Sequence, residues 1–247
     1  MAAKRRALVT GAASGIGRAI AERLVQDGHD VLSVDLTPSA DAPGVSFEAD
    51  LTTVEGNRAS VDQAVERFEG LDLVIPCAGI QHVAPVEEFP EDRWQALIGV
   101  LLTSPFLLAK YAWPHLREAG NGQLIVVASV HGLVASPFKT GYVSAKHGVI
   151  GLTKVLALEG AEHGIRVVAL CPGYVRTPLV EGQVSAQAAA HGMDEARVLE
   201  EVILAPHAIK ELIEPSEVAD TVAFLLTSAG RTITGAALPM DMGWSAR

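Results

Sequence analysis

The strongest constraint on the fold is a regular alternation between short apolar runs and longer segments with helical periodicity. The apolar runs predict strands and the longer segments predict helices, and their order favours parallel strands joined by right-handed helical crossovers. The predicted strands are apolar almost throughout, which is typical of a sheet covered by helices on both faces. We expect strands at 5–10, 30–35, 44–50, 71–77, 122–129, 165–171 and 233–241, and helices at 15–28, 53–69, 91–118, 141–163, 180–213 and 216–228.

This pattern predicts an α/β fold with a doubly wound parallel sheet in a single domain, residues 1–247. A chain of 247 residues with 49% hydrophobic content can bury a substantial core, and neither a linker nor a repeat interrupts the alternation. Residues 180–213 are less regular, because QAAAHG and APHA break the helical period. We interpret this segment as a small helical lid over a ligand site, with a surface helical pair that gates nothing as the alternative.

Bulk properties narrow the class of partner. The formal net charge is −10 without a clustered basic face, which argues against nucleic acid or an anionic membrane as partner. The sequence has no run of about 18 uncharged apolar residues, and MAAKRRALV leads directly into a strand, so we expect a cytoplasmic protein. Cys77 and Cys171 offer no metal-ligand spacing, and two intervening strand spacings of about 9.6 Å predict that they remain unpaired.

A glycine-rich turn follows the first predicted strand. Gly11, Gly15 and Gly17 have the spacing Gly-x3-Gly-x-Gly in TGAASGIG. Glycines at such a turn permit close approach of a pyrophosphate, and the N-terminus of the following helix favours its negative charge. A turn with a purely structural role is the alternative.

Asp35 ends the second predicted strand, 20 residues after Gly15. A carboxylate there can accept hydrogen bonds from the adenosine ribose and repels a 2′-phosphate. Ser14, Leu36 and Thr37 supply no cation for that phosphate. The pattern therefore favours NAD over NADP, unless Asp35 is merely a solvated acid at a strand end.

Tyr142 and Lys146 are four residues apart on a predicted helix and share one of its faces. A nearby ammonium stabilises tyrosinate, so we expect Lys146 to lower the pKa of Tyr142 toward working pH and make it a usable acid and base. Ser129 ends the predicted strand thirteen residues earlier, at the edge where open α/β sheets bind ligands. A lone Tyr-x3-Lys pair is usually a helix surface, but its combination with the glycine turn, Asp35 and Ser129 favours a catalytic role.

With these motifs in their order and spacing, the chain resembles the short-chain dehydrogenase/reductase family over essentially its full length. The resemblance implies a single Rossmann domain, usually a homotetramer, in which the tyrosine exchanges a proton with the substrate oxygen. Ser129 would hold that oxygen, and Lys146 would also bind the nicotinamide ribose. Asp50 and Leu51 would flank adenine, while Val175 and Thr177 would contact the carboxamide. The implied NAD-binding set is Gly11, Ser14, Gly15, Ile16, Gly17, Asp35, Asp50, Leu51, Cys77, Ala78, Gly79, Tyr142, Lys146, Pro172, Gly173, Val175 and Thr177.

The segments AGIQHVAPVEEFP, ASVHGLVASPFK and PLVEGQ are similar to those of D-3-hydroxybutyrate dehydrogenases within that family. The similarity implies that Gln81, His131, Lys139 and Gln183 grip a substrate carboxylate. It also places Tyr174, where those enzymes often have tryptophan, and Trp244 at the pocket wall. As alternatives, the polar residues lie in solvent or at strand ends, and the two aromatic residues pack in the core or at a subunit interface.

The chain departs from the family where asparagine is usual. Cys77, preceded by Pro76, stands before Ala-Gly, and Leu101 occupies the helix position that normally carries a catalytic asparagine. In the family the helix is distorted there, and a backbone carbonyl holds a water that leads to the catalytic lysine. Pro105 has no N–H to donate to the carbonyl of Leu101, so we hypothesise that this carbonyl stays free for the water. A kink that serves packing alone is the alternative.

The sequence thus predicts NAD-dependent oxidation of D-3-hydroxybutyrate to acetoacetate, or the reverse, with Ser129, Tyr142 and Lys146 as catalytic residues. A short-chain dehydrogenase for another hydroxy or oxo acid, a sugar or a secondary alcohol is the alternative. A weakly catalytic NAD(H)-binding sensor ranks lower, because all three catalytic residues are present. The two lysines receive different roles: Lys146 acts with Tyr142, and Lys139 reaches the substrate carboxylate.

Overall fold

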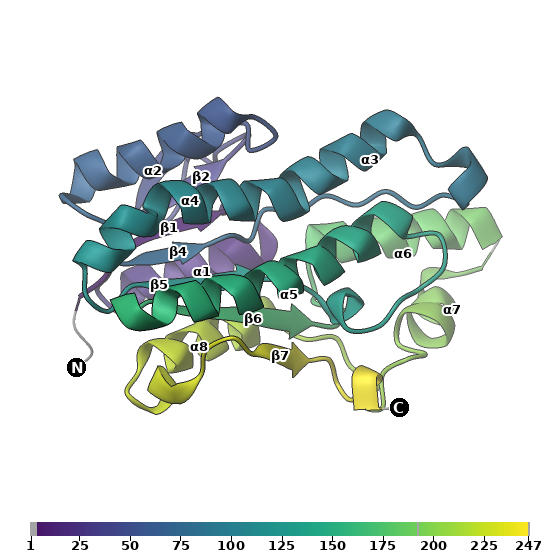
Figure 1. Cartoon of the computed structure of the whole chain (residues 1–247). Helices are drawn as coiled ribbons and strands as arrows, with labels where there is room; N and C mark the ends of the chain where they lie inside the picture. The colour runs from purple at the N-terminus through teal and green to yellow at the C-terminus, as the bar shows by residue number, and fades with distance from the viewer. Residues whose placement is uncertain (1–3, 192, 247) are drawn as a thin grey trace.

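A seven-stranded parallel sheet forms the centre of the computed structural model, which describes residues 4–191 and 193–246. Its strand order is β3-β2-β1-β4-β5-β6-β7, and every paired neighbour is parallel (Figure 1). The predicted α/β class and doubly wound sheet are confirmed. The strands are β1 (Arg6–Thr10), β2 (Asp30–Asp35), β3 (Val45–Glu48), β4 (Leu73–Ile75), β5 (Gln123–Val127), β6 (Arg166–Pro172) and β7 (Ala237–Met240).

Helices cover both faces of the sheet (Figure 1). On one face, Leu8 and Leu124 pack with apolar residues of α2, α4 and α5; on the other, Ala7 and Val9 pack with α1 and α8. Alternate residues of one strand point to opposite faces, so strands between two helical layers must be apolar throughout. The main helices are α1 (Gly15–Gln26), α2 (Val54–Phe68), α3 (Glu91–Ile98), α4 (Ser104–Glu118), α5 (Thr140–Gly160) and α8 (Pro215–Leu226).

The predicted helix 91–118 is interrupted. A π-helical segment, Gly99–Thr103, joins α3 to α4, and the backbone N–H of Ser104 donates to the carbonyl of Gly99. By length and apolar composition the whole stretch Glu91–Glu118, with a mean hydropathy of 1.5, is long and apolar enough to cross a membrane. Its apolar residues have a different location here: Leu97, Leu101 and Leu108 are buried against the rest of the protein.

Two helices beyond the carboxyl ends of the strands form most of the segment interpreted as a lid (Figure 1). They are α6 (Pro178–His191) and α7 (Glu195–Val198), and a π-helical segment, Leu199–Ile203, extends α7. Of the QAAAHG stretch, Gln187–Ala190 continue α6, because alanine is the strongest helix former, and the helix ends at His191. Gly192 lies outside the described residues. Val198, Ile203 and Leu204 form a small separate core under these helices.

Candidate active site

A cleft with a volume of ≈ 380 Å³ opens at the carboxyl edge of the sheet. It lies where the strand order reverses, between β1 and β4, the usual ligand crevice of such sheets. The turn after β1, the segment after β4 and α5 all contribute to its wall. Of the predicted cofactor residues, the cleft is lined by Gly11, Ser14, Gly15, Ile16, Gly17, Asp35, Asp50, Leu51, Cys77, Ala78, Gly79, Tyr142, Lys146 and Thr177.

The glycine turn is packed so tightly that two of its glycines, Gly11 and Gly17, have no room for a side chain. Gly11 has a φ of +67°, and a Cβ there would lie 2.7 Å from the Cα of Ala78. A Cβ on Gly17 would lie 2.2 Å from the carbonyl oxygen of Gly11. The exposed Ser14 precedes α1, whose first turn carries no acidic residue. These features fit a pyrophosphate held against backbone N–H groups at the start of α1.

Asp35 lies at the end of β2 and lines the cleft. One of its carboxylate oxygens accepts a hydrogen bond from the N–H of Ala13 at 3.0 Å, which ties it to the glycine turn. Among the described residues lining the cleft, Lys146 is the only lysine or arginine. Arg18 lies outside this lining and is engaged by Glu22 and Asp41, each at 2.8 Å.

Ser129, Tyr142 and Lys146 meet where β5 ends against α5. The Lys146 ammonium donates to the carbonyl of Val127 at 2.8 Å and lies 5.7 Å from the centroid of the Tyr142 ring. Burial lowers the pKa of Lys146 to about 8, so this side chain is mostly protonated at neutral pH. Ser129, which is buried, accepts a hydrogen bond from the N–H of His131 at 3.1 Å.

The pKa of Tyr142 corrects the sequence-based expectation. Burial raises it to about 12, and hydrogen bonding from Ser129 acts in the opposite direction without offsetting the burial. The net direction of this pKa is therefore opposite to the one expected from Lys146, whose ammonium donates to the carbonyl of Val127. Tyr142 is therefore a neutral phenol, ready to donate a proton.

A second, smaller cavity of ≈ 60 Å³ adjoins the cleft. Tyr142 and Leu179 line both spaces, so the phenol stands at their junction. All six predicted substrate residues meet at this cavity, although they come from segments far apart in the sequence. Its lining consists of Gln81, Ser129, Val130, His131, Lys139, Tyr142, Gly173, Tyr174, Leu179, Val180, Gln183 and Trp244.

Lys139 supplies the cation of this cavity. Its side chain is buried, and its ammonium donates to the Tyr174 hydroxyl at 3.0 Å. Burial lowers the pKa of Lys139 to about 8. None of the described salt bridges involves Lys139. A buried ammonium held only by a neutral hydroxyl gains stability from an anionic ligand.

Neutral polar groups complete the cavity. His131 lies 3.0 Å from the Ser136 hydroxyl through Nε2, and burial together with Lys139 lowers the pKa of His131 to about 3. The histidine is therefore uncharged at physiological pH. The side-chain oxygen of Gln183 is buried without a hydrogen-bond partner, which leaves a polar group available to a ligand.

An aromatic wall closes the cavity. Tyr174 stacks on Trp244 with ring centroids 5.5 Å apart, and the His131 ring meets Trp244 edge-on at 5.1 Å. His207, which the sequence reasoning missed, lies buried behind these rings, 5.6 Å from that of Trp244. A Cβ on Gly173 would lie 3.0 Å from the Nε2 of His207. Only APHA marked this position in the sequence, and nothing there distinguishes a wall residue from a loop histidine.

Three predicted cofactor residues fall outside the cleft lining. Pro172 ends β6, and Gly173 lines the smaller cavity. The side chain of Val175 is buried in the core, because its backbone pairs with Ile213 and turns the side chain inward. The family resemblance was the guide to Val175, and a sequence motif does not give side-chain direction.

The positions that lack asparagine have clear structural settings. Leu101 is buried beside Ala145 and Tyr142, inside the π-helical segment, so the expected helix distortion is present. The N–H of Cys77 donates to the Thr10 hydroxyl at 2.9 Å, and burial raises the pKa of its thiol to about 12. Cys77 and Cys171 are both free, as their strand positions predict. No metal-binding group of three His, Cys, Asp or Glu occurs among residues 4–191 and 193–246.

The fold, the glycine turn and the Ser-Tyr-Lys arrangement define a dinucleotide-dependent oxidoreductase. The chain belongs to the short-chain dehydrogenase family, whose model matches residues 5–188. Members of this family use a nicotinamide cofactor, NAD(H) or NADP(H).

Comparison with individual proteins narrows the relationship. The chain is 39% identical to D-beta-hydroxybutyrate dehydrogenase of Rhizobium meliloti (strain 1021), over 98% of each chain. It is 43% identical to the "uncharacterized oxidoreductase YxjF" of Bacillus subtilis (strain 168), over 99% of each. Ligand-free aldohexose dehydrogenase of Thermoplasma acidophilum shares the fold with a TM-score of 0.91 and 32% identity, covering 99% of this chain and 95% of that one.

Proposed function

We propose that the protein is an NAD-dependent dehydrogenase that interconverts D-3-hydroxybutyrate and acetoacetate. The observation that carries the proposal is the position of Tyr142, which lines both the dinucleotide cleft and a small cavity holding a buried lysine. One buried cation beside several neutral polar groups suits a small hydroxy acid. The Rhizobium relative, whose name states this activity, supports the choice of substrate.

In the oxidation direction, Lys139 binds the carboxylate and thereby directs the hydroxyl toward Ser129 and Tyr142. Tyr142 first releases its own phenol proton to solvent. As tyrosinate it then takes the hydroxyl proton while the substrate carbon is oxidised, and Ser129 holds the oxygen. Lys146 keeps positive charge beside the phenol and would hold the nicotinamide ribose. A bound nicotinamide would supply the hydride acceptor. In the reverse direction the neutral phenol donates its proton to the forming alkoxide.

NAD is proposed over NADP for an electrostatic reason. Asp35 lines the cleft, and no described lining residue near it is a lysine or arginine. A 2′-phosphate would therefore face a carboxylate without a compensating cation.

Initial rates with NAD or NADP, each with D-3-hydroxybutyrate and with neutral secondary alcohols, test both parts. We expect the highest kcat/KM with NAD and the hydroxy acid. A preference for neutral alcohols would defeat the substrate assignment and leave the dehydrogenase assignment standing. An aldohexose is the second candidate, because the Thermoplasma relative is named for one, so the panel includes glucose.

A panel without any turnover, despite tight NADH binding, would favour a sensor role.

We also propose a cytoplasmic homotetramer. Exposed apolar side chains on α4 and α5 support self-association, namely Phe106, Val155 and Leu158, the last with 80% of its surface exposed. Light scattering measures the assembly directly.

A further inference from the structure

A third cavity lies at the opposite edge of the sheet from the dinucleotide cleft. Arg5 precedes β1, Asn121 precedes β5, Arg166 begins β6 and Thr234 precedes β7, so the amino ends of these parallel strands surround it. Its volume of ≈ 560 Å³ exceeds the ≈ 380 Å³ of the cleft. The assigned oxidoreductase chemistry uses none of these residues.

Arginines dominate the charge of this third cavity. Arg5, Arg166 and Arg231 all line it, and none of its described lining residues is Asp or Glu. Within residues 4–191 and 193–246, none of these three arginines forms a salt bridge. Three cations gathered without a lining acid are unexpected in a chain with a net charge of −10.

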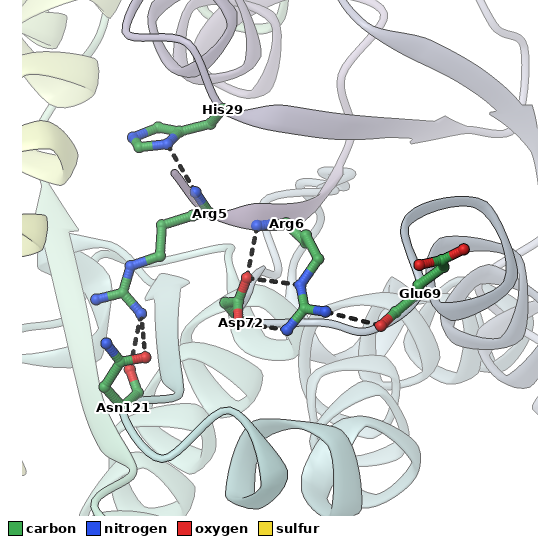
Figure 2. Close-up of polar contacts among 6 residues, drawn as sticks. All are labelled: Arg5, Arg6, His29, Glu69, Asp72 and Asn121. Atoms are coloured by element: carbon green, nitrogen blue, oxygen red, sulfur yellow. Dashed lines mark hydrogen bonds and ion pairs between the residues drawn. The ribbon is translucent and has the colours of Figure 1, made fainter. Parts of the chain in front are cut away.

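Arg6, the next residue after Arg5, shows how the chain neutralises a guanidinium group elsewhere. Arg6 points to the other side of β1 and binds both carboxylate oxygens of Asp72, at 2.9 and 2.8 Å (Figure 2). It also donates to the carbonyl of Glu69 at 2.7 Å. The pKa of Arg6 is raised, chiefly by its hydrogen bonds to Asp72.

Arg5 is buried with 8% of its surface exposed, yet its guanidinium bonds only neutral acceptors. It donates to the backbone and side-chain oxygens of Asn121 at 2.9 and 2.7 Å (Figure 2). The guanidinium of Arg166 donates to the amide oxygen of Gln123 at 3.1 Å. Asp72 contributes a favourable charge to Arg5 from a distance, but burial dominates and lowers the pKa of Arg5.

We propose that this arginine cavity, defined by Arg5, Arg166 and Arg231, binds a small phosphate-class anion. A phosphate monoester carries up to two negative charges and three acceptor oxygens, which suit several guanidinium groups better than a monocarboxylate does. Asn121 and the Ser228 hydroxyl, which also line the cavity, offer further polar contacts. Inorganic phosphate and a phosphorylated metabolite share this chemistry. The site is separate from the dinucleotide cleft and from the assigned reaction.

Calorimetric titration tests the proposal on protein already saturated with its reduced dinucleotide, so that the glycine turn is occupied. Inorganic phosphate, glycerol 3-phosphate and acetate are compared at constant ionic strength. We expect saturable binding of one phosphate-class anion per chain and none of acetate. Tighter binding of the ester than of phosphate identifies a metabolite as the natural source, and the reverse identifies phosphate.

Arg231→Gln and Arg166→Gln should each weaken phosphate binding by about tenfold. Arg67→Gln is the matched control, because it removes an exposed cation of α2 away from the cavity and should leave binding unchanged. Arg231 is itself exposed, so its substitution keeps the test independent of folding. Absent saturation, or equal weakening in all three variants, overturns the proposal. A change of oligomeric state in Arg231→Gln without loss of phosphate binding also overturns it, in favour of a subunit contact.

Discussion

The dinucleotide cleft and the substrate cavity share Tyr142 but are built in different ways. The cleft depends on backbone: the glycine turn after β1 approaches the segment after β4 so closely that a Cβ at Gly11 would collide with Ala78. The cavity depends on side chains that arrive from separate segments, including Gln81, Lys139, Gln183 and Trp244. A backbone-built site suits a cofactor common to a family, whereas a side-chain-built site can change its substrate by a few substitutions.

Lys146 and Lys139 illustrate this difference between the cleft and the cavity. Lys146 lines the cleft and donates to the backbone of Val127; Lys139 lines the cavity and donates to Tyr174. Burial lowers both pKa values to about 8, so charge alone does not distinguish them. Their positions do, and variants of each should have separable effects.

The largest effect is expected for Lys146→Ala. Turnover should fall by about 10²–10⁴-fold for every substrate, because the proton chemistry of Tyr142 loses its adjacent cation. Steady-state rates with the hydroxy acid and a neutral alcohol measure this, with circular dichroism as the control for folding. A loss restricted to carboxylate substrates would contradict the assignment of Lys146 to the cleft.

Lys139→Ala should raise KM for D-3-hydroxybutyrate by about 10- to 100-fold, the effect of removing one charge-assisted hydrogen bond. Turnover of a neutral secondary alcohol should change little. Arg197→Ala removes an exposed positive charge on α7 and is a control for the general loss of a cation. Equal losses toward charged and neutral substrates would refute the division between the two lysines.

The pH dependence sharpens the same comparison. Below pH 8 Lys139 is mainly charged and binds a carboxylate; as pH rises through about 8 the charge and this binding are lost. The kcat/KM of the hydroxy acid, divided by that of a neutral alcohol, should therefore fall by up to about tenfold per pH unit above this value. The ratio cancels the titration of Lys146, which affects both substrates. Lys139→Ala should make the ratio independent of pH.

The smallest effect is expected for Pro105→Ala. The new N–H can donate to the carbonyl of Leu101, closing an α-helical hydrogen bond beside the π-helical segment. If this carbonyl holds a water that leads to Lys146, turnover should fall by several fold, with a shifted pH profile. Unchanged turnover and pH profile would leave Pro105 with a packing role only.

The sequence predicted the fold well because several independent signals agreed. Strands between two helical layers must be apolar throughout, and this made β1, β5 and β6 easy to place. The glycine spacing and the Tyr-x3-Lys pair are local, so their geometry followed from helix and turn conformation. Family resemblance, in contrast, supplied the substrate residues, since no local pattern connects Gln81 with Trp244.

Other features were beyond the sequence because they depend on long-range packing. The inward direction of Val175 follows from its pairing with Ile213, and His207 becomes a wall residue only when Tyr174 and Trp244 pack against it. The raised pKa of Tyr142 reflects burial, which outweighs the proximity of a lysine four residues away. The family resemblance implied a helix distortion at Leu101, but its π-helical form required the structure.

The sequence by itself determined the α/β class and the order of its elements, because periodicity and turn chemistry are encoded within a few neighbouring residues. It also determined the chemical types available for catalysis. Tertiary structure alone decided which side chains share a cavity, how far burial shifts their pKa values, and that Arg5 and Arg6 differ so sharply in neutralisation. Those properties depend on distance and solvent exclusion in three dimensions, which neighbouring residues in a sequence do not specify.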